Sequence, residues 1–196
     1  MDIPQSDHAQ RTIAFLQEPL AQEVIDSIGG NAPPEIKSLP VKWLHIFKRR
    51  GNSFANSIAE RVRVTEVSVL PSPDDAEKLE GKVVCEIEVT QDMCNSKGVM
   101  HAGCAVFLMD EGIAVSLVVG NAGEGRITPA GVSQTLNTYF HEPAPVGTRL
   151  RIVSTSMYSG YQSNGGRCEI FDVANHRLIA SGTQLMMPPS IPAKWM

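Results

Sequence analysis

The stretch NSKGVMHAGCAVFLMDEG, residues 95–112, carries the features on which the interpretation of the whole chain depends. Apolar residues continue from its middle onward and predict a helix over 102–119 that ends at Gly120. This helix is apolar nearly all round, as a helix enclosed by its neighbours must be. A buried, unpaired carboxylate is costly, so Asp110 is expected to reach a cavity or a partner surface. Glu111 lies about 100° further round the helix and is expected to be solvated or paired.

Strands are predicted on both sides of this helix. Alternating apolar and polar residues indicate them at 61–70, 82–90, 128–140, 148–159, 166–173 and 177–187. Turn-forming residues at 164–166 and at Asn175–His176 suit hairpins. One helix among mostly antiparallel strands implies a sheet that wraps around the helix. We therefore predict an α+β domain over residues 56–196, with an antiparallel sheet of about six strands around a central helix.

The first 55 residues have helical signals and are predicted to form a helical extension of this domain. Three helices are expected: one from Ser6 to just before Pro19, one over 20–28, and one that starts at Ser38, has Pro40 in its first turn and ends at Gly51.

The third predicted helix places Trp43, Ile46 and Phe47 on one face and a basic run, 48–50, at its end. We expect the apolar face to pack on the main domain, because cations are also favourable at a helix C-terminus without any ligand. The alternative is that the basic end touches a membrane surface or an anionic ligand.

Charge and composition argue against several classes of function. The net charge of −4 does not suit general nucleic-acid binding, which needs a basic face. The longest apolar run, 113–119, is too short to cross a bilayer, so no stable membrane insertion is expected. The first seventeen residues resemble neither a signal peptide nor a transit peptide. Four cysteines without metal-ligand spacing predict free thiols, no metal site and a cytoplasmic location.

Several short motifs together resemble a known family. They are Asn95, Gly98, His101, Ala102–Gly103 and Asp110, then GVSQTLNTYFHEPAPVG over 131–147 and RLIASGT over 177–183. This set resembles the hotdog-fold acyl-CoA thioesterases of the 4-hydroxybenzoyl-CoA thioesterase superfamily, in particular the phenylacetic-acid-pathway and thioesterase-superfamily-member-2 type. The resemblance covers about residues 58 to 187. Ala102 departs from the glycine usual in the family, but it provides the same backbone N–H.

The resemblance implies a role for each of these residues. Hydrolysis of a thioester needs a positioned water, a group that activates it and a donor for the developing oxyanion. Asp110 would be the general base or nucleophile, and Ser133 would help to hold the water. The Asn95 side chain and the Ala102 N–H would polarise the carbonyl at the positive end of the helix dipole.

Two further residues border the substrate in this reading. Gly103 would let the carbonyl approach the backbone closely, and His101 would orient the entry to the helix. Plainer interpretations exist for the others: Asn95 as a turn residue, Asp110 as an acid in an interface salt bridge, and Ser133 as an ordinary strand hydroxyl.

The leading hypothesis is therefore an acyl-CoA thioesterase that needs no cofactor, since CoA is part of the substrate. A hotdog hydratase or dehydratase that uses His101 is the second hypothesis, and a non-catalytic acyl-CoA-binding or scaffold protein is the third. Asp110 lies eight residues beyond Ala102, or roughly 12 Å along a helix. One helix cannot complete the site, so we expect a two-fold homodimer that shares its sites, and the resemblance allows a dimer of dimers.

Overall fold

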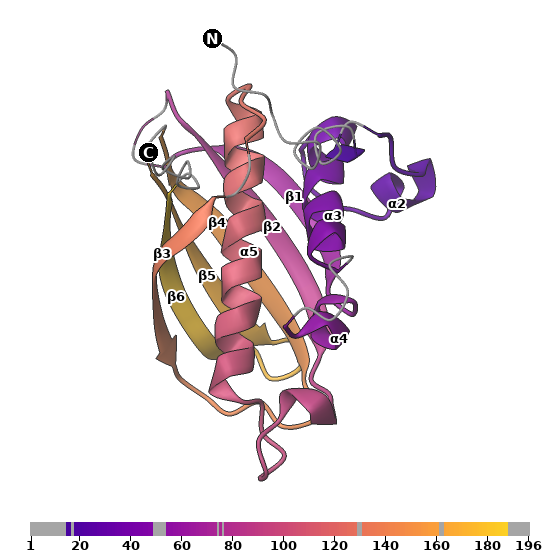
Figure 1. Cartoon of the computed structure of the whole chain (residues 1–196), viewed down its shortest axis with the longest axis vertical. Helices are drawn as coiled ribbons and strands as arrows, with labels where there is room; N and C mark the ends of the chain where they lie inside the picture. Colours follow the sequence, from indigo (N-terminus) through magenta and orange to yellow (C-terminus); the bar gives the residue numbers. More distant parts are fainter. Residues whose placement is uncertain are drawn as a thin grey trace, which may run out of the picture.

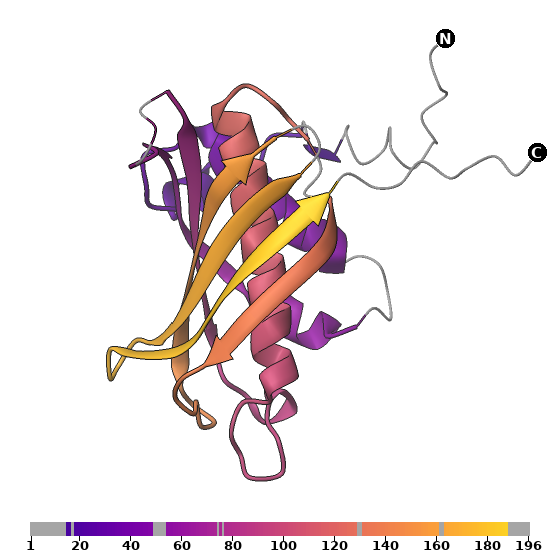
Figure 2. The ribbon, with the colours of Figure 1, turned by 90° about the vertical axis from the view of Figure 1, so that its left-hand side faces the viewer.

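The sheet is antiparallel throughout and has six strands in the order β1-β2-β4-β5-β6-β3. The structure, a computed structural model, describes residues 15–16, 18–48, 54–73, 75, 77–128, 131–160 and 163–187. The strands are β1 (Arg63–Pro71), β2 (Leu79–Glu88), β3 (Val132–Phe140), β4 (Arg149–Ser159), β5 (Asn164–Asp172) and β6 (Arg177–Met187). The sheet curves around one long helix, α5 (Ala102–Gly123), as Figures 1 and 2 show. The predicted fold class is confirmed.

Helix α5 is longer than predicted, because Gly120 lies inside it and does not end it. A Cβ at Gly120 would lie 2.5 Å from the Ser156 Oγ, so the glycine permits close contact between the helix and β4. The helix ends instead at Gly123, and Gly125 beyond it has a φ of +77°. The prediction that Gly120 ends the helix is therefore wrong, because this glycine serves the packing of the helix on β4.

Helix α5 is longer than the apolar run over 113–119 from which the expectation about membrane spans was argued. With 22 residues and a mean hydropathy of 1.8 in its most apolar window, the helix is long and apolar enough to cross a bilayer by these two measures. However, 67% of that window is buried inside the protein. The same apolar surface is what a core helix needs to fill the inside of a curved sheet.

The predicted hairpin turn at 164–166 is wrong, whereas the turn at Asn175–His176 is confirmed. Residues 164–166 begin β5, where Gly165 and Gly166 pair with β4 and β6. A Cβ at Gly166 would lie 2.6 Å from the Ile113 side chain on α5. Gly166 therefore marks a close helix–sheet contact and is part of a strand, not of a turn.

Before the sheet the chain forms α2 (Gln22–Asp26) and α3 (Pro34–Lys48), both within the N-terminal extension, and α4 (Asn56–Ala59) just after it. Helix α3 lies against α5 and β1, and α2 and α4 contact α3 (Figure 1). Helix α3 begins before the predicted Ser38, with Pro34 at its first position, where a missing N–H costs nothing. Pro40 consequently lies inside the helix. Most of the helix predicted from Ser6 lies outside the described residues.

Two residues of the predicted apolar face of the third helix pack on the main domain as expected. Trp43 is buried in the hydrophobic core, and Ile46 packs against it. The side chain of Phe47 and the basic run that follows lie outside the described part of the structure. All four cysteines are described, and none of them forms a disulfide.

The two edges of the sheet differ in what covers them. The N-terminal extension lies along β1, where the Gly29 N–H donates to the Thr65 carbonyl at 2.9 Å and the Gly29 carbonyl accepts from the Val67 N–H at 3.0 Å. At the other edge, no described strand pairs with the outer side of β3. Tyr139 and Phe140 on β3 are 67% and 55% exposed, so this edge is both unpaired and apolar.

Candidate active site

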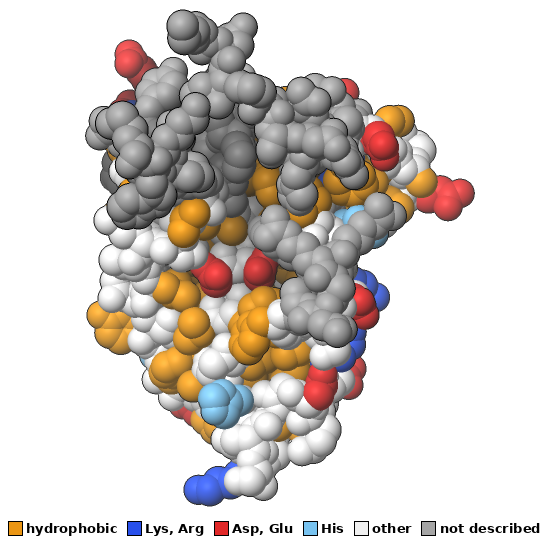
Figure 3. Space-filling model, in the orientation of Figure 1, with side chains coloured by type: hydrophobic (Ala, Val, Ile, Leu, Met, Phe, Trp, Pro, Cys, Tyr) orange, Lys and Arg blue, Asp and Glu red, His pale blue; other side chains and the backbone are white. Residues whose placement is uncertain are grey.

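Asp110 lies at the centre of a small polar cluster between α5 and the sheet. Its Oδ1 accepts a hydrogen bond from the Ser133 hydroxyl at 2.7 Å and another from the Gln184 amide nitrogen. The same Gln184 nitrogen also donates to the Ser133 Oγ at 2.8 Å. No described residue bonds the Asp110 Oδ2, which leaves this oxygen available to a water or substrate. In Figure 3, acidic side chains lie among apolar ones on this face of the molecule.

The local sequence explains how Ser133 and Gln184 meet Asp110. Gln184 lies on the inner face of β6, and β3 pairs antiparallel with β6 beside it. The register between β3 and β6 shifts between Ser133 and Thr135, and such an irregularity re-aims the side chains near it. Ser133, which is predicted to help to hold the water, therefore lies in contact with Asp110, although no role follows from contact alone.

A second group of predicted residues lies at the N-terminus of α5. His101 is the N-cap, and its Nδ1 accepts a hydrogen bond from the Gly103 N–H at 3.0 Å. The His101 carbonyl accepts from the Cys104 N–H at 2.9 Å. The Ala102 N–H has no hydrogen-bond partner among the residues that the structure describes. It is therefore an unoccupied donor at the positive end of a long helix.

His101 is exposed, and its ring nitrogen Nδ1 is used in capping the helix. A hydratase or dehydratase mechanism would need an acid opposite this histidine. Within the described ranges, His101 makes no hydrogen bond to a carboxylate. The geometry of His101 thus resembles the predicted orienting role more than that of an acid–base catalyst.

Asn95 combines both interpretations that the sequence left open. Its Oδ1 accepts hydrogen bonds from the backbone N–H groups of Lys97, at 2.9 Å, and of Val99, at 3.3 Å, so it does organise a turn. These bonds fix the orientation of the amide and leave its Nδ2 without a partner in the part of the chain that is described. Asn95 and Ala102 both line a cleft of about 330 Å³, which Phe140 and Ile179 also border.

The structure does not bring these two groups together within one chain. The cleft that holds Asn95 and Ala102 is not lined by Asp110, Ser133 or Gln184. Two turns of α5 separate the two sets of residues, consistent with the roughly 12 Å expected from the helix rise.

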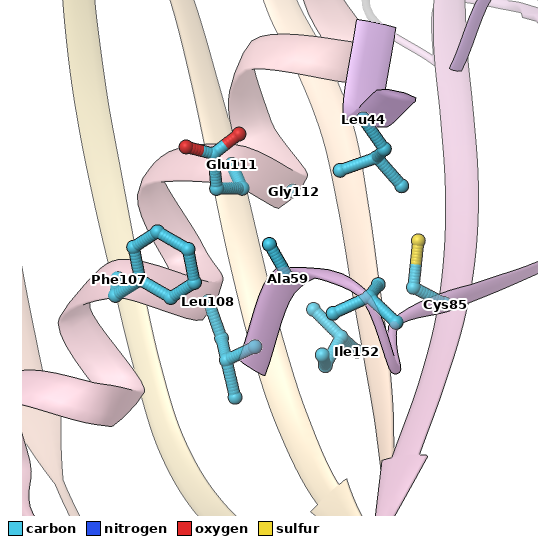
Figure 4. A pocket seen from close by; sticks show the side chains of 9 residues that line it. Leu44, Ala59, Cys85, Phe107, Leu108, Glu111, Gly112 and Ile152 are labelled. Atoms are coloured by element: carbon cyan, nitrogen blue, oxygen red, sulfur yellow. The ribbon is translucent and has the colours of Figure 1, made fainter. Parts of the chain in front are cut away.

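Glu111 contradicts the expectation that it would be solvated or paired. Its Oε2 is buried and has no hydrogen-bond partner. Burial and, second, the charge of Asp110 raise the pKa of Glu111 to about 7. Figure 4 shows Glu111 on the same side of α5 as Phe107, next to Ala59 of α4. Leu44 of α3 and Ala59 of α4 line this pocket, so these two helices cover a side of α5 that would otherwise meet solvent.

Gln184 is not among the site residues predicted from the sequence, although the pattern of its strand marks it as unusual. Within the strand over 177–187, alternate positions carry the inward-facing Ala180, Gly182 and Met186. A glutamine in this apolar register, at position 184, is an exception of the same kind as Asp110 in its helix. The period-two pattern of the strand places position 184 on the inner face, where a polar side chain is unusual.

Comparison with known proteins agrees with this fold. No family model matches the chain. Solved structures that resemble it include thioesterase superfamily member 2 of zebra fish, with a TM-score of 0.59, 23% identity and coverage of 76% of this chain and 97% of that one. The Mus musculus protein of the same name has a TM-score of 0.58, 21% identity and the same coverage. This likeness defines the class: the chain has the hotdog fold.

The sequence relatives are more specific. Acyl-coenzyme A thioesterase 13 of Homo sapiens and of Pongo abelii are each 28% identical to the chain over 125 residues, which are 63% of this chain and 79% of the relative. The predicted resemblance to hotdog-fold acyl-CoA thioesterases is confirmed.

Proposed function

We propose that this protein is an acyl-CoA thioesterase, which hydrolyses a CoA or related thioester to a free acid and a thiol. The observation that carries the proposal is the state of Asp110, a carboxylate that is bonded through Oδ1 and has its Oδ2 available. The relationship to proteins named acyl-coenzyme A thioesterase 13 supports the same reaction. The substrate class is therefore an acyl group linked to CoA.

In this mechanism, Asp110 Oδ2 accepts a proton from a water as the water oxygen attacks the thioester carbonyl carbon. The negative charge that develops on the carbonyl oxygen is stabilised by the Ala102 N–H and the Asn95 Nδ2, both of which lack other partners in the described structure. Collapse of the tetrahedral intermediate breaks the carbon–sulfur bond. The thiolate takes the proton back from Asp110, and the free acid remains.

We also propose that each site is shared between two subunits of a homodimer. Strand β3 is a free edge, so a second copy can extend the sheet by antiparallel pairing across a two-fold axis. If the axis passes near Leu136, the middle of β3, then Ser133 lies opposite Tyr139 of the partner subunit. Phe140, the next residue, borders the cleft that holds Asn95 and Ala102. The pairing thus joins the Asp110 group of one subunit to the Asn95 group of the other.

The first test is thiol release from a panel of acyl-CoAs, measured with dithionitrobenzoate. Asp110→Asn keeps the shape of the side chain but removes its basicity, so kcat is expected to fall by roughly 10²–10⁴. Glu88→Gln, at an exposed position on β2, is the control and is expected to retain full activity. Near wild-type turnover by Asp110→Asn would refute the assignment, and no turnover of any substrate by the wild type would favour a binding or scaffold protein.

The shared site is tested by mixing Asp110→Asn and Asn95→Ala subunits through co-expression. Each mixed dimer holds one doubly altered site and one intact site. With random pairing about half of the dimers are mixed, so roughly a quarter of wild-type activity is expected to return. If the two inactive variants form mixed dimers, seen by native mass spectrometry, and activity stays absent, the shared site is excluded.

A further inference from the structure

Gln184 is a polar residue in a position where packing alone would favour an apolar one. It lies on the inner face of β6 and is only 3% exposed. Its neighbours on that face are Gly182 and Met186, and it points toward α5, where its partner is Asp110. Burial of an amide costs free energy unless its polar atoms are hydrogen-bonded.

The hydrogen bonds of this cluster leave the Gln184 Oε1 without a partner. The two hydrogens of the Gln184 Nε2 go to the Asp110 Oδ1 and the Ser133 Oγ, while the Ser133 hydrogen goes to the same Asp110 oxygen. These three bonds determine which end of the amide faces Asp110, because a carboxylate oxygen can only accept. The Gln184 Oε1 is then buried without any hydrogen-bond partner.

An unpaired, buried carbonyl oxygen destabilises the fold, so Gln184 is a poor choice for stability. A methionine has a similar length, fills the same space and carries no unsatisfied oxygen. We infer that Gln184 is a positioning residue, which holds Asp110 and Ser133 in the geometry needed for hydrolysis. This role rests on the proposed thioesterase function, whereas the contact itself does not.

The arrangement acts on Asp110 in two ways. Two donors on Oδ1 fix the plane of the carboxylate, so that Oδ2 faces the site where the water must bind. They also hold Asp110 beside the Ser133 hydroxyl, which donates to the same oxygen. The Gln184 amide connects both effects to Ser133, whose hydroxyl it orients.

The first experiment compares Gln184→Met with wild type in thiol release and in thermal unfolding. We expect kcat to fall on the order of 10- to 100-fold with KM little changed, and the melting temperature to stay equal or rise. Gln22→Met is the matched control, because Gln22 also donates to an aspartate, Asp26, at 2.8 Å, but on the exposed surface of α2. It is expected to leave kcat and KM unchanged.

Two results would overturn the inference. If Gln184→Met melts at a clearly lower temperature and loses activity in proportion, the glutamine is a structural residue. If it keeps the wild-type kcat, the glutamine positions nothing.

Gln184→Glu supplies a second test that does not depend on stability. The introduced carboxyl can donate to Asp110 only when protonated, and it repels Asp110 when ionised. Activity is therefore expected to be retained only toward acidic pH and to be lost as the pH rises. Parallel pH profiles for this variant and wild type would contradict the donor role.

A spectroscopic test separates this contact from the proposed function. In a ¹⁵N-correlated NMR spectrum, the Gln184 side-chain amide signals are assigned by their loss in Gln184→Met. We expect the chemical shifts of these signals to differ between wild type and Asp110→Asn, because the Gln184 nitrogen donates directly to the Asp110 Oδ1. If they differ but the wild type hydrolyses no thioester, the contact stands and the proposed function fails; if they do not respond to Asp110→Asn, the inference itself fails.

Discussion

Glu111→Gln is expected to stabilise the protein at alkaline pH and to have little effect at acidic pH. The reason is the environment of the carboxyl, which is enclosed by α5 and the N-terminal extension and has a buried, unpartnered Oε2 (Figure 4). Burial and the charge of Asp110 raise the pKa of Glu111 from its ordinary 4.5 to about 7 in the folded protein. The unfolded chain has no such environment and keeps the ordinary value.

The sign and size of the effect follow from proton linkage. Between pH 4.5 and about 7 the folded protein binds more protons at Glu111 than the unfolded chain does, so the free energy of unfolding falls as the pH rises. The loss is complete above pH 7. Since one pKa unit corresponds to about 1.4 kcal/mol, the total cost at pH 8 is of order 3 kcal/mol. A neutral glutamine does not carry this cost.

The assay is urea unfolding at pH 4.5 and pH 8, at one fixed protein concentration because association would also contribute to stability. Tryptophan fluorescence can follow the unfolding transition, since Trp43 is buried in the folded protein. The difference between Glu111→Gln and wild type should be about 2–3 kcal/mol larger at pH 8 than at pH 4.5. Glu88→Gln, on the exposed surface, should show no such change. If Glu111→Gln is equally or less stable than wild type at pH 8, the carboxylate has a stabilising partner and the reasoning is wrong.

Two further predictions concern the entry to α5 and the helix–sheet contact. Asn95→Ala should lose on the order of 10² or more in kcat, as expected for an oxyanion donor, while His101→Ala should lower stability by about 1 kcal/mol through loss of the N-cap; kinetics and thermal melts on both variants measure this. A His101→Ala protein that melts like wild type but has no turnover, beside an active Asn95→Ala, would instead favour the dehydratase. Gly166→Ala places a Cβ 2.6 Å from the Ile113 side chain and 3.1 Å from the Thr155 carbonyl oxygen, so it should destabilise the fold by about 1–3 kcal/mol. The neighbouring Gly165→Ala meets nothing closer than 3.8 Å and should be nearly neutral in the same denaturation assay, and equal effects of the two would contradict this account of the contact.

Local sequence patterns were sufficient for the elements of this fold. The apolar run after Ala102 predicted the central helix, and alternation predicted the strands, because side-chain periods of 3.6 and 2 leave a direct record in the sequence. The acid at Asp110 and the helix entry at His101–Ala102 were also visible, since each is a local exception to a pattern. The same holds for the apolar face of Trp43 and Ile46, which packs into the core.

Contacts between distant parts of the chain decided the rest. Gly120 was predicted to end the helix and Gly166 to lie in a hairpin turn. Each is a glycine because another element approaches it closely, and no local sequence pattern records such a contact. The pKa of Glu111 is raised because the carboxyl is buried in a pocket that α3 and α4 help to line, and because the charge of Asp110 lies close by. Gln184 meets Asp110 across 74 positions of sequence, through the pairing of β6 and the curvature of the sheet. Side-chain periodicity is a property of neighbouring residues, whereas burial, charge coupling and hydrogen-bond partners arise only once the sheet has closed around the helix.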